Sequence, residues 1–329
     1  EVTNVVQRLR HHPAIVLWCG NNEQDDNMIR PGGYLEQYPV VSWENYDKLF
    51  QEVIPQTAVL LDPDRPYWPC SPHHPLDRER KTVDWEKSSG DAHVWDVWHG
   101  GFPISWFEEN PVFRFVSEYG FAAYPTMETI RSFTSPEDRR FGSPVMEHHH
   151  KERASGNQDY GDARIARQMA RLFGLARGFE NIVYVSQLLQ GEAMKIASEA
   201  YRRNYLQTQG ALYWQVNENW PTTCKSGMDY YGRWKALQYL TRHFFNPVLV
   251  SGQVKGTKVT VWGVNDRLED VSGKLSWCLY RLDGVPAKKG EQSVRLPANS
   301  SSLLAEFDFQ EVLAENPEYR TYLATSYEN

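Results

Sequence analysis

The sequence predicts a parallel α/β domain over residues 1–246, followed by an all-β sandwich over residues 247–329. From Ala14 to Pro247, short apolar runs alternate with segments of helical spacing, which is the pattern of parallel βα units. After Pro247, apolar and polar residues alternate and turn residues recur roughly every 8–12 positions. That second pattern is typical of an immunoglobulin-like antiparallel sandwich.

Five apolar runs in the first segment are predicted strands, namely Ala14–Gly20, Pro66–Cys70, His93–Trp98, Phe113–Glu118 and Leu212–Asn217. Continuous apolar runs of this kind suit strands that are covered on both faces. A closed (β/α)₈ barrel needs eight strands, and an open parallel edge would expose unpaired backbone groups. The fold is therefore either an open α/β sheet or a barrel that lacks its first three or so strands.

The beginning of the sequence favours the incomplete barrel. Residues 2–12 have the spacing of a helix that closes at Pro13, so we expect the sequence to open within a domain. We therefore expect upstream polypeptide or another chain to complete the barrel. Further helices are predicted at residues 43–58, 126–133, 162–177, 181–203 and 232–247, and sandwich strands at 256–266, 273–282, 290–296 and 300–309.

Composition excludes several classes of protein. The net charge is −7 and no basic cluster suggests binding to nucleic acid or to an anionic membrane. A run of 18 apolar residues, as a membrane-spanning helix requires, does not occur. The four cysteines lack zinc-site spacing, and neither a metal nor a cofactor is expected. The 12 Trp and 18 Tyr are abundant, and some are expected to line a sugar-binding cleft, because aromatic faces stack on sugar rings.

Two glutamates are the candidate catalytic residues. Glu23 follows the apolar run that ends at Gly20, and Glu118 ends the run that begins at Phe113. Two carboxylates that flank a scissile bond are what hydrolysis of a glycosidic bond requires. Each glutamate also has a structural interpretation, because the Asn-Asn-Glu triplet could cap the next helix and Glu118 could pair with an arginine.

The consecutive histidines His148, His149 and His150 are a second candidate cluster. Neighbouring side chains in a loop cannot easily converge on one metal ion, and no carboxylate spacing supports such a site. A polar loop at the rim of a cleft, or a plain surface position, is the expectation for this triplet.

Four signatures in a fixed order carry a resemblance to a known family. They are Ile15–Glu23 (IVLWCGNNE), Ser117–Phe121 (SEYGF), Tyr213–Pro221 (YWQVNENWP) and Asp229–Lys235 (DYYGRWK). Through them the chain resembles the β-mannosidase branch of the family 2 glycoside hydrolases. The resemblance covers Val2 to Val250 and extends more loosely into the sandwich.

The resemblance implies a catalytic (β/α)₈ barrel in which the five predicted strands are strands four to eight. It implies that Glu23 is the general acid/base after strand four and Glu118 the nucleophile after strand seven. It also implies a retaining exo-β-mannosidase that acts on terminal β-mannosyl residues of oligosaccharides or glycans through a covalent glycosyl-enzyme. The residues it suggests for substrate binding are Asn22, Trp68, His93, Trp95, Trp214 and Asn217.

Two alternatives stay open at this point. A related exo-β-glycosidase could use the same pair of glutamates on a glucosaminide, galactoside or glucuronide. A carbohydrate-binding protein without catalytic activity could also be built on an incomplete barrel.

Overall fold

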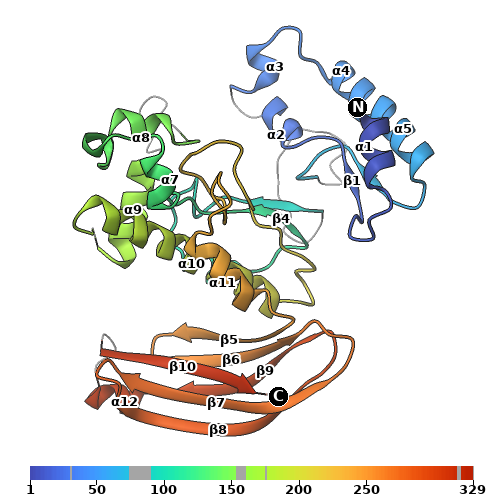
Figure 1. Cartoon of the computed structure of the whole chain (residues 1–329). Coiled ribbons are helices and arrows are strands. Elements are labelled where there is room, and N and C mark those ends of the chain that lie inside the picture. Colours follow the sequence, from blue (N-terminus) through green and yellow to red (C-terminus); the bar gives the residue numbers. More distant parts are fainter. Residues whose placement is uncertain (30–31, 74–89, 153–160, 175, 317–319, 329) are drawn as a thin grey trace. The chain divides into compact units, whose positions relative to one another are not determined.

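The computed structural model describes residues 1–29, 32–73, 90–152, 161–174, 176–316 and 320–328 (Figure 1). The chain forms two compact units. Glu1–Val94 and Phe113–Tyr119 make the first unit, and Trp95–Val112 and Gly120–Asn329 make the second. The chain therefore leaves the first unit after Val94, returns at Phe113 and leaves it again after Tyr119.

The helices of the first unit confirm two predicted segments. They are α1 (Val2–Leu9), α2 (Gln24–Ile29), α3 (Tyr34–Gln37), α4 (Trp43–Asp47), a π-helix (Lys48–Val53) and α5 (Ile54–Leu61). The segment from α4 to α5 is continuous and begins where Ser42 accepts a hydrogen bond from the Asn45 amide, as an N-cap does. Helix α1 contacts α5, so the first and last described helices of this unit pack against each other.

The strands of the first unit are short and parallel. Strand β1 (Trp18–Cys19) pairs with β2 (Tyr67–Trp68), and β3 (Ala92–Val94) pairs with β4 (Val116–Tyr119). Parallel pairing confirms the predicted βα pattern, although each strand is shorter than its apolar run. Among the described residues these strands make two separate pairs, so the eight-stranded barrel stays a prediction.

The second unit holds the longest helix of the chain. Its helices are α6 (Trp106–Glu109), α7 (Met127–Arg131), a 3₁₀ helix (Pro136–Asp138), α8 (Pro144–His148), α9 (Asp162–Leu172), α10 (Phe179–Arg203) and α11 (Ala236–Phe244). Helix α10 contacts α6, α9 and α11, so it is the central support of these helices. A Cβ atom on Gly191 would clash with Leu240 on α11, so this glycine permits the close approach of the two helices.

The predicted strand at 212–217 is wrong. The structure shows an irregular segment there, and its peptide groups bond to a neighbouring loop. The Gln215 amide donates to the Lys225 carbonyl, and the Gly227 amide donates to the Gln215 carbonyl. The apolar pattern of this run suggested a strand, but its hydrogen-bond partners lie in a turn-rich loop that follows it closely in sequence.

The predicted sandwich is confirmed as two three-stranded antiparallel sheets. Their strands are β5 (Val248–Lys255), β6 (Lys258–Asn265), β7 (Val271–Arg281), β8 (Pro286–Leu296), β9 (Ser300–Asp308) and β10 (Thr321–Glu328), with a short helix α12 (Gln310–Glu315) before the last. The sheet orders are β5-β6-β9 and β10-β7-β8 (Figure 1). Between the sheets lies a core of Val259, Val261, Leu275, Leu279 and Phe309.

Buried polar contacts join the sandwich to the helices within the second unit. Arg203 at the end of α10 bonds Ser251 on β5 and Glu108 on α6, and Ser251 Oγ donates to Glu199 Oε2 over 2.6 Å. Helix α10 also contacts β6 and β9. The domain boundary near Asn246 stays a prediction. Over the described residues, no helix has the length and apolar character needed to cross a membrane.

Candidate active site

The register of β3 and β4 places a histidine beside one of the two glutamates. His93 is paired with Glu118 in this parallel pair, after an irregularity between Ala92 and His93. Residues paired across neighbouring strands point their side chains to the same face of a sheet. The pairing therefore explains why His93 Nδ1 lies 3.3 Å from Glu118 Oε2.

Glu23 reaches the same place from the end of β1. Its amide donates to the Ser71 carbonyl over 2.7 Å, beside a parallel bridge between Asn22 and Ser71. Glu23 has a φ of 56°, in the left-handed region that residues other than glycine rarely adopt, and such conformations cluster at functional sites. The Asn21 side chain accepts from the Gln24 amide and so caps α2. The capping interpretation is thus correct for Asn21 and leaves the Glu23 carboxylate for the site.

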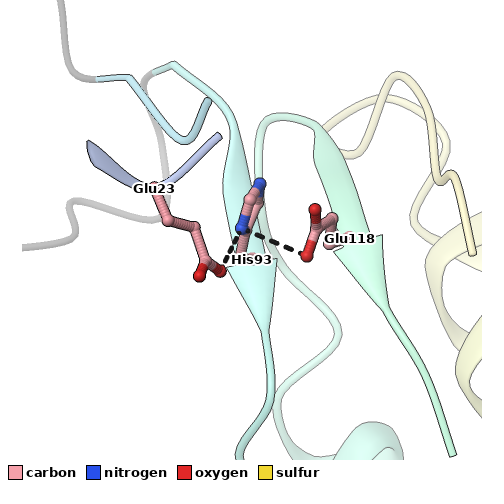
Figure 2. A group of neighbouring side chains, drawn as sticks. All are labelled: Glu23, His93 and Glu118. Atoms are coloured by element: carbon pink, nitrogen blue, oxygen red, sulfur yellow. Dashed lines mark hydrogen bonds and ion pairs between the residues drawn. The ribbon is translucent and has the colours of Figure 1, made fainter. Parts of the chain in front are cut away.

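Glu23, His93 and Glu118 form one cluster, which we call the glutamate–histidine cluster (Figure 2). His93 Nδ1 lies 2.7 Å from Glu23 Oε1, and the ligand atoms of all three side chains lie within 4.8 Å of one another. The His93 side chain is 4% exposed, Glu118 11% and Glu23 35%. One carboxylate is therefore buried and the other is open to solvent.

A second layer of polar side chains contacts His93 on the Nε2 side of its ring, away from the two glutamates. His93 Nε2 lies 3.0 Å from Ser71 Oγ, and Ser71 Oγ and Ser117 Oγ each donate to Asp91 Oδ2 over 2.5 Å. The other oxygen of Asp91 accepts from the His73 amide over 2.7 Å. Asp91 is thus a carboxylate surrounded by donors.

Sequence reasoning did not single out Ser71, Asp91 or Ser117 as site residues, although signals for them were present. Asp91 lies two residues before His93, next to the predicted strand that begins at His93. Ser71 follows the predicted strand that ends at Cys70, and Ser117 precedes the candidate nucleophile. The carboxyl ends of parallel strands meet at one edge of a sheet, where a site is expected, and Ser71 follows β2 at such an end. Asp91 precedes β3 and Ser117 lies within β4, so this rule would not have found them.

The glutamate–histidine cluster has the donor set of a metal site, but its spacing is that of a hydrogen bond. Two ligand atoms on a tetrahedral zinc ion, each about 2.0–2.2 Å from the metal, are separated by about 3.3 Å. The 2.7 Å between His93 Nδ1 and Glu23 Oε1 is shorter than that and fits a shared proton. These three residues thus suit proton transfer better than metal binding.

The remaining predicted substrate-binding residues fall in both units. In the first unit, Asn22 is exposed and the Trp68 ring packs edge-on against His73, with centroids 5.1 Å apart. In the second unit, Trp214 is 44% exposed and Asn217 is exposed. The Lys225 ammonium lies 4.9 Å from the centroid of the Trp95 ring, within the range of a cation–π interaction. Sugar binding by these residues stays a prediction.

Trp95 and Trp214 meet at Gly120, two residues after Glu118. A Cβ atom at Gly120 would lie 2.5 Å from the Trp214 carbonyl oxygen and 3.0 Å from both Trp95 Cζ3 and Lys225 Cδ. Only a residue without a side chain fits this approach without displacing backbone.

We expect Gly120→Ala to lower the free energy of unfolding by about 1–3 kcal/mol, because an inserted methyl group forces its neighbours apart. Calorimetric thermal unfolding of the full-length protein measures the effect. Gly252→Ala is the matched control, because a Cβ atom there would meet nothing within 4 Å. Equal unfolding temperatures for the two variants would contradict the close packing at Gly120.

The histidine triplet is more buried than the sequence suggested. His149 stacks on Phe133 with ring centroids 3.9 Å apart, and its Nδ1 lies 2.6 Å from the Pro221 carbonyl. His150 is 1% exposed, and burial lowers its pKa to about 3. The prediction of a surface or rim loop is therefore wrong for His150, which is buried and whose backbone forms a parallel bridge with Thr223.

Comparisons with known proteins agree with the four signatures. The model of the Mannosidase Ig/CBM-like domain family matches residues 257–329. A β-mannosidase from Capra hircus is 30% identical over 82% of this chain and 32% of its own length. The crystal structure of a β-D-mannosidase from Dictyoglomus thermophilum matches with a TM-score of 0.84 at 33% identity, over 100% of this chain and 38% of that one.

A more distant structure shares the fold. An exo-chitosanase from Amycolatopsis orientalis matches with a TM-score of 0.66 at 16% identity, over 98% of this chain and 38% of that one. The chain thus spans about a third of the length of its relatives. With its sandwich, its sequence relatives and its match to a solved β-mannosidase, the chain belongs to the β-mannosidase branch of the family 2 glycoside hydrolases.

Proposed function

We propose that the protein containing this chain is a retaining exo-β-mannosidase, which removes terminal β-mannosyl residues by double displacement. The observation that carries the proposal is the pairing of Glu23 and Glu118, whose carboxylate oxygens lie within 4.8 Å in the glutamate–histidine cluster. Retaining glycosidases hold their two carboxyl groups about 5–5.5 Å apart, whereas inverting enzymes leave about 6.5–9.5 Å for a water molecule. The short separation therefore supports retention.

Exposure supports the division of roles between the two glutamates. Glu118 is the more buried, as suits a nucleophile that attacks the anomeric carbon away from bulk water. Glu23 is about three times more exposed, at 35% against 11%, as suits an acid/base that meets a leaving group and then a water molecule. Glu118 forms the covalent intermediate while Glu23 protonates the departing oxygen, and Glu23 then takes a proton from the attacking water.

The choice of mannose rests on the relatives that are named β-mannosidases. As the resemblance implies, Asn22 and Asn217 would bond sugar hydroxyls, and Trp68, Trp95 and Trp214 would supply ring faces for stacking. These contacts, in the protein as a whole, would distinguish mannosides from glucosaminides, galactosides and glucuronides.

A panel of chromogenic β-glycosides tests the proposal on the full-length protein. We expect hydrolysis of the β-mannoside, with a product whose anomeric configuration by NMR is initially β. Hydrolysis of a glucosaminide but not of the mannoside would contradict the sugar assignment. Sugar binding without turnover, unchanged in Glu118→Gln, would instead support the carbohydrate-binding alternative.

A further inference from the structure

In the glutamate–histidine cluster, His93 contacts both carboxylates (Figure 2). It also contacts Ser71 in the polar layer described above. Its Nδ1 lies 2.7 Å from Glu23 Oε1 and 3.3 Å from Glu118 Oε2, and its Nε2 lies 3.0 Å from Ser71 Oγ. With 4% of its side chain exposed, His93 has little access to water. Its proton must therefore be shared with the groups it touches.

The hydrogen-bond donors around Asp91 determine which nitrogen of His93 carries a proton. Ser71 Oγ lies 2.5 Å from Asp91 Oδ2, a separation that requires a hydrogen atom between the two oxygens. An ionised carboxylate has no hydrogen atom to donate. The single hydroxyl hydrogen of Ser71 is therefore donated to Asp91. Ser71 Oγ then offers a lone pair to His93, and Nε2 must be the donor.

The same reasoning places another proton at the other nitrogen. With Nε2 protonated, a neutral imidazole would present a bare lone pair at Nδ1. That lone pair would face Glu23 Oε1 at 2.7 Å and Glu118 Oε2 at 3.3 Å, and all three atoms would be acceptors. Contact at 2.7 Å requires one proton, held either on Nδ1 or on the Glu23 carboxyl group.

We propose that His93 is a positioning residue that holds one proton between the acid/base Glu23 and the nucleophile Glu118, in a tautomer fixed by Ser71 and Asp91. This inference rests on the proposed function and deepens it. A proton at this position keeps Glu118 ionised and hydrogen-bonded while Glu23 is ready to act as an acid.

The proton count balances over the reaction. At rest, Glu23, His93 and Glu118 share one proton beyond the one on Nε2, so the cluster carries a net charge of −1. In the first step this proton goes to the departing glycosidic oxygen as Glu118 becomes a neutral ester, which leaves Glu23 ionised, His93 neutral and the net charge at −1. In the second step Glu23 takes a proton from water, the hydroxide oxygen bonds to the sugar, and Glu118 is released as a carboxylate.

Leaving-group dependence tests this role in the full-length protein. We expect His93→Gln to lower kcat/KM by about 10²-fold for alkyl and poorly activated aryl mannosides, in the range of general acid catalysis. The loss should be much smaller for a 2,4-dinitrophenyl mannoside, which leaves without protonation. Ser71→Ala should show the same pattern more weakly, because it cuts the link between Asp91 and His93. The control His12→Gln, at an exposed position near α1, should leave kcat/KM unchanged for both kinds of substrate.

A second measurement does not depend on turnover. Solid-state ¹⁵N spectra of protein labelled at histidine give this measurement. The signal of His93 is identified as the one that disappears in His93→Gln, and it should show a protonated Nε2 in the wild type. Ser71→Ala should change that signal, whereas the signal of His12 should stay the same. A bare Nε2 in the wild type would overturn the inference.

The two experiments separate the inference from the proposed function. Equal losses for all leaving groups in His93→Gln would overturn the role of His93 while the enzyme remained a glycosidase. A wild-type protein that hydrolyses no glycoside would overturn the proposed function, and the ¹⁵N spectrum would still decide the tautomer and the shared proton.

Discussion

Glu118→Gln should lower kcat for β-mannoside hydrolysis by about 10⁴–10⁶-fold, the range seen when a covalent nucleophile is removed. The amide keeps the size of the carboxylate but cannot form the glycosyl ester. Stopped assays with an aryl mannoside at saturating concentration measure the loss, and circular dichroism checks that the fold is retained. Glu44→Gln, at an exposed position on α4, is the matched control and should leave the rate unchanged.

Added nucleophiles make the test of Glu118 sharper. In Glu118→Ala, azide should enter the space left by the carboxylate and attack an activated mannosyl fluoride or aryl mannoside from the vacated face. The product should be the α-mannosyl azide, with inverted configuration. Formation of the β-azide would show that Glu118 is not the nucleophile.

Glu23→Ala should lower kcat/KM by about 10²–10⁴-fold for mannosides with poor leaving groups, because general acid assistance is lost. For 2,4-dinitrophenyl mannoside the first step should be nearly unaffected, and the covalent intermediate should accumulate because no base activates water. A burst of dinitrophenolate followed by slow turnover measures both effects in one experiment.

Azide distinguishes the roles of the two glutamates directly. With Glu23→Ala it should attack the glycosyl-enzyme in place of water and give the β-mannosyl azide, with retained configuration. A uniform loss of rate across leaving groups, without a burst, would contradict the assignment of Glu23 as acid/base.

Both glutamates could be found from the sequence because strand ends are local features. An apolar run that ends in Gly20 and is followed by Glu23 marks a carboxyl end regardless of what the strand packs against. The side-by-side placement of Glu23 and Glu118 depended on pairing, which periodicity does not encode. The resemblance to a family supplied that step. In the structure, the pairing of His93 with Glu118 and the contact of His93 with Glu23 give it a physical basis.

The role of His93 could not be read in the same way. A histidine near a strand end suggests a contact with substrate, and the sequence analysis assigned it one. Its position between two carboxylates depends on a one-residue irregularity before His93, and its hydrogen bond to Ser71 depends on the segment that follows β2. Likewise, the run at 212–217 has the apolar pattern of a strand but bonds to a local loop, because pattern alone does not identify the partner of a peptide group.

The path of the chain between the two units constrains how the protein can be divided. Because the chain leaves the first unit at Val94, returns at Phe113 and leaves again after Tyr119, no single cut releases either unit whole. A fragment that stops at Val94 would keep Glu23 and His93 but lose Glu118, and one that starts at Phe113 would keep Glu118 alone. Split-protein reporters and stepwise truncation are therefore poor tools for this site, whereas point substitution leaves both units intact.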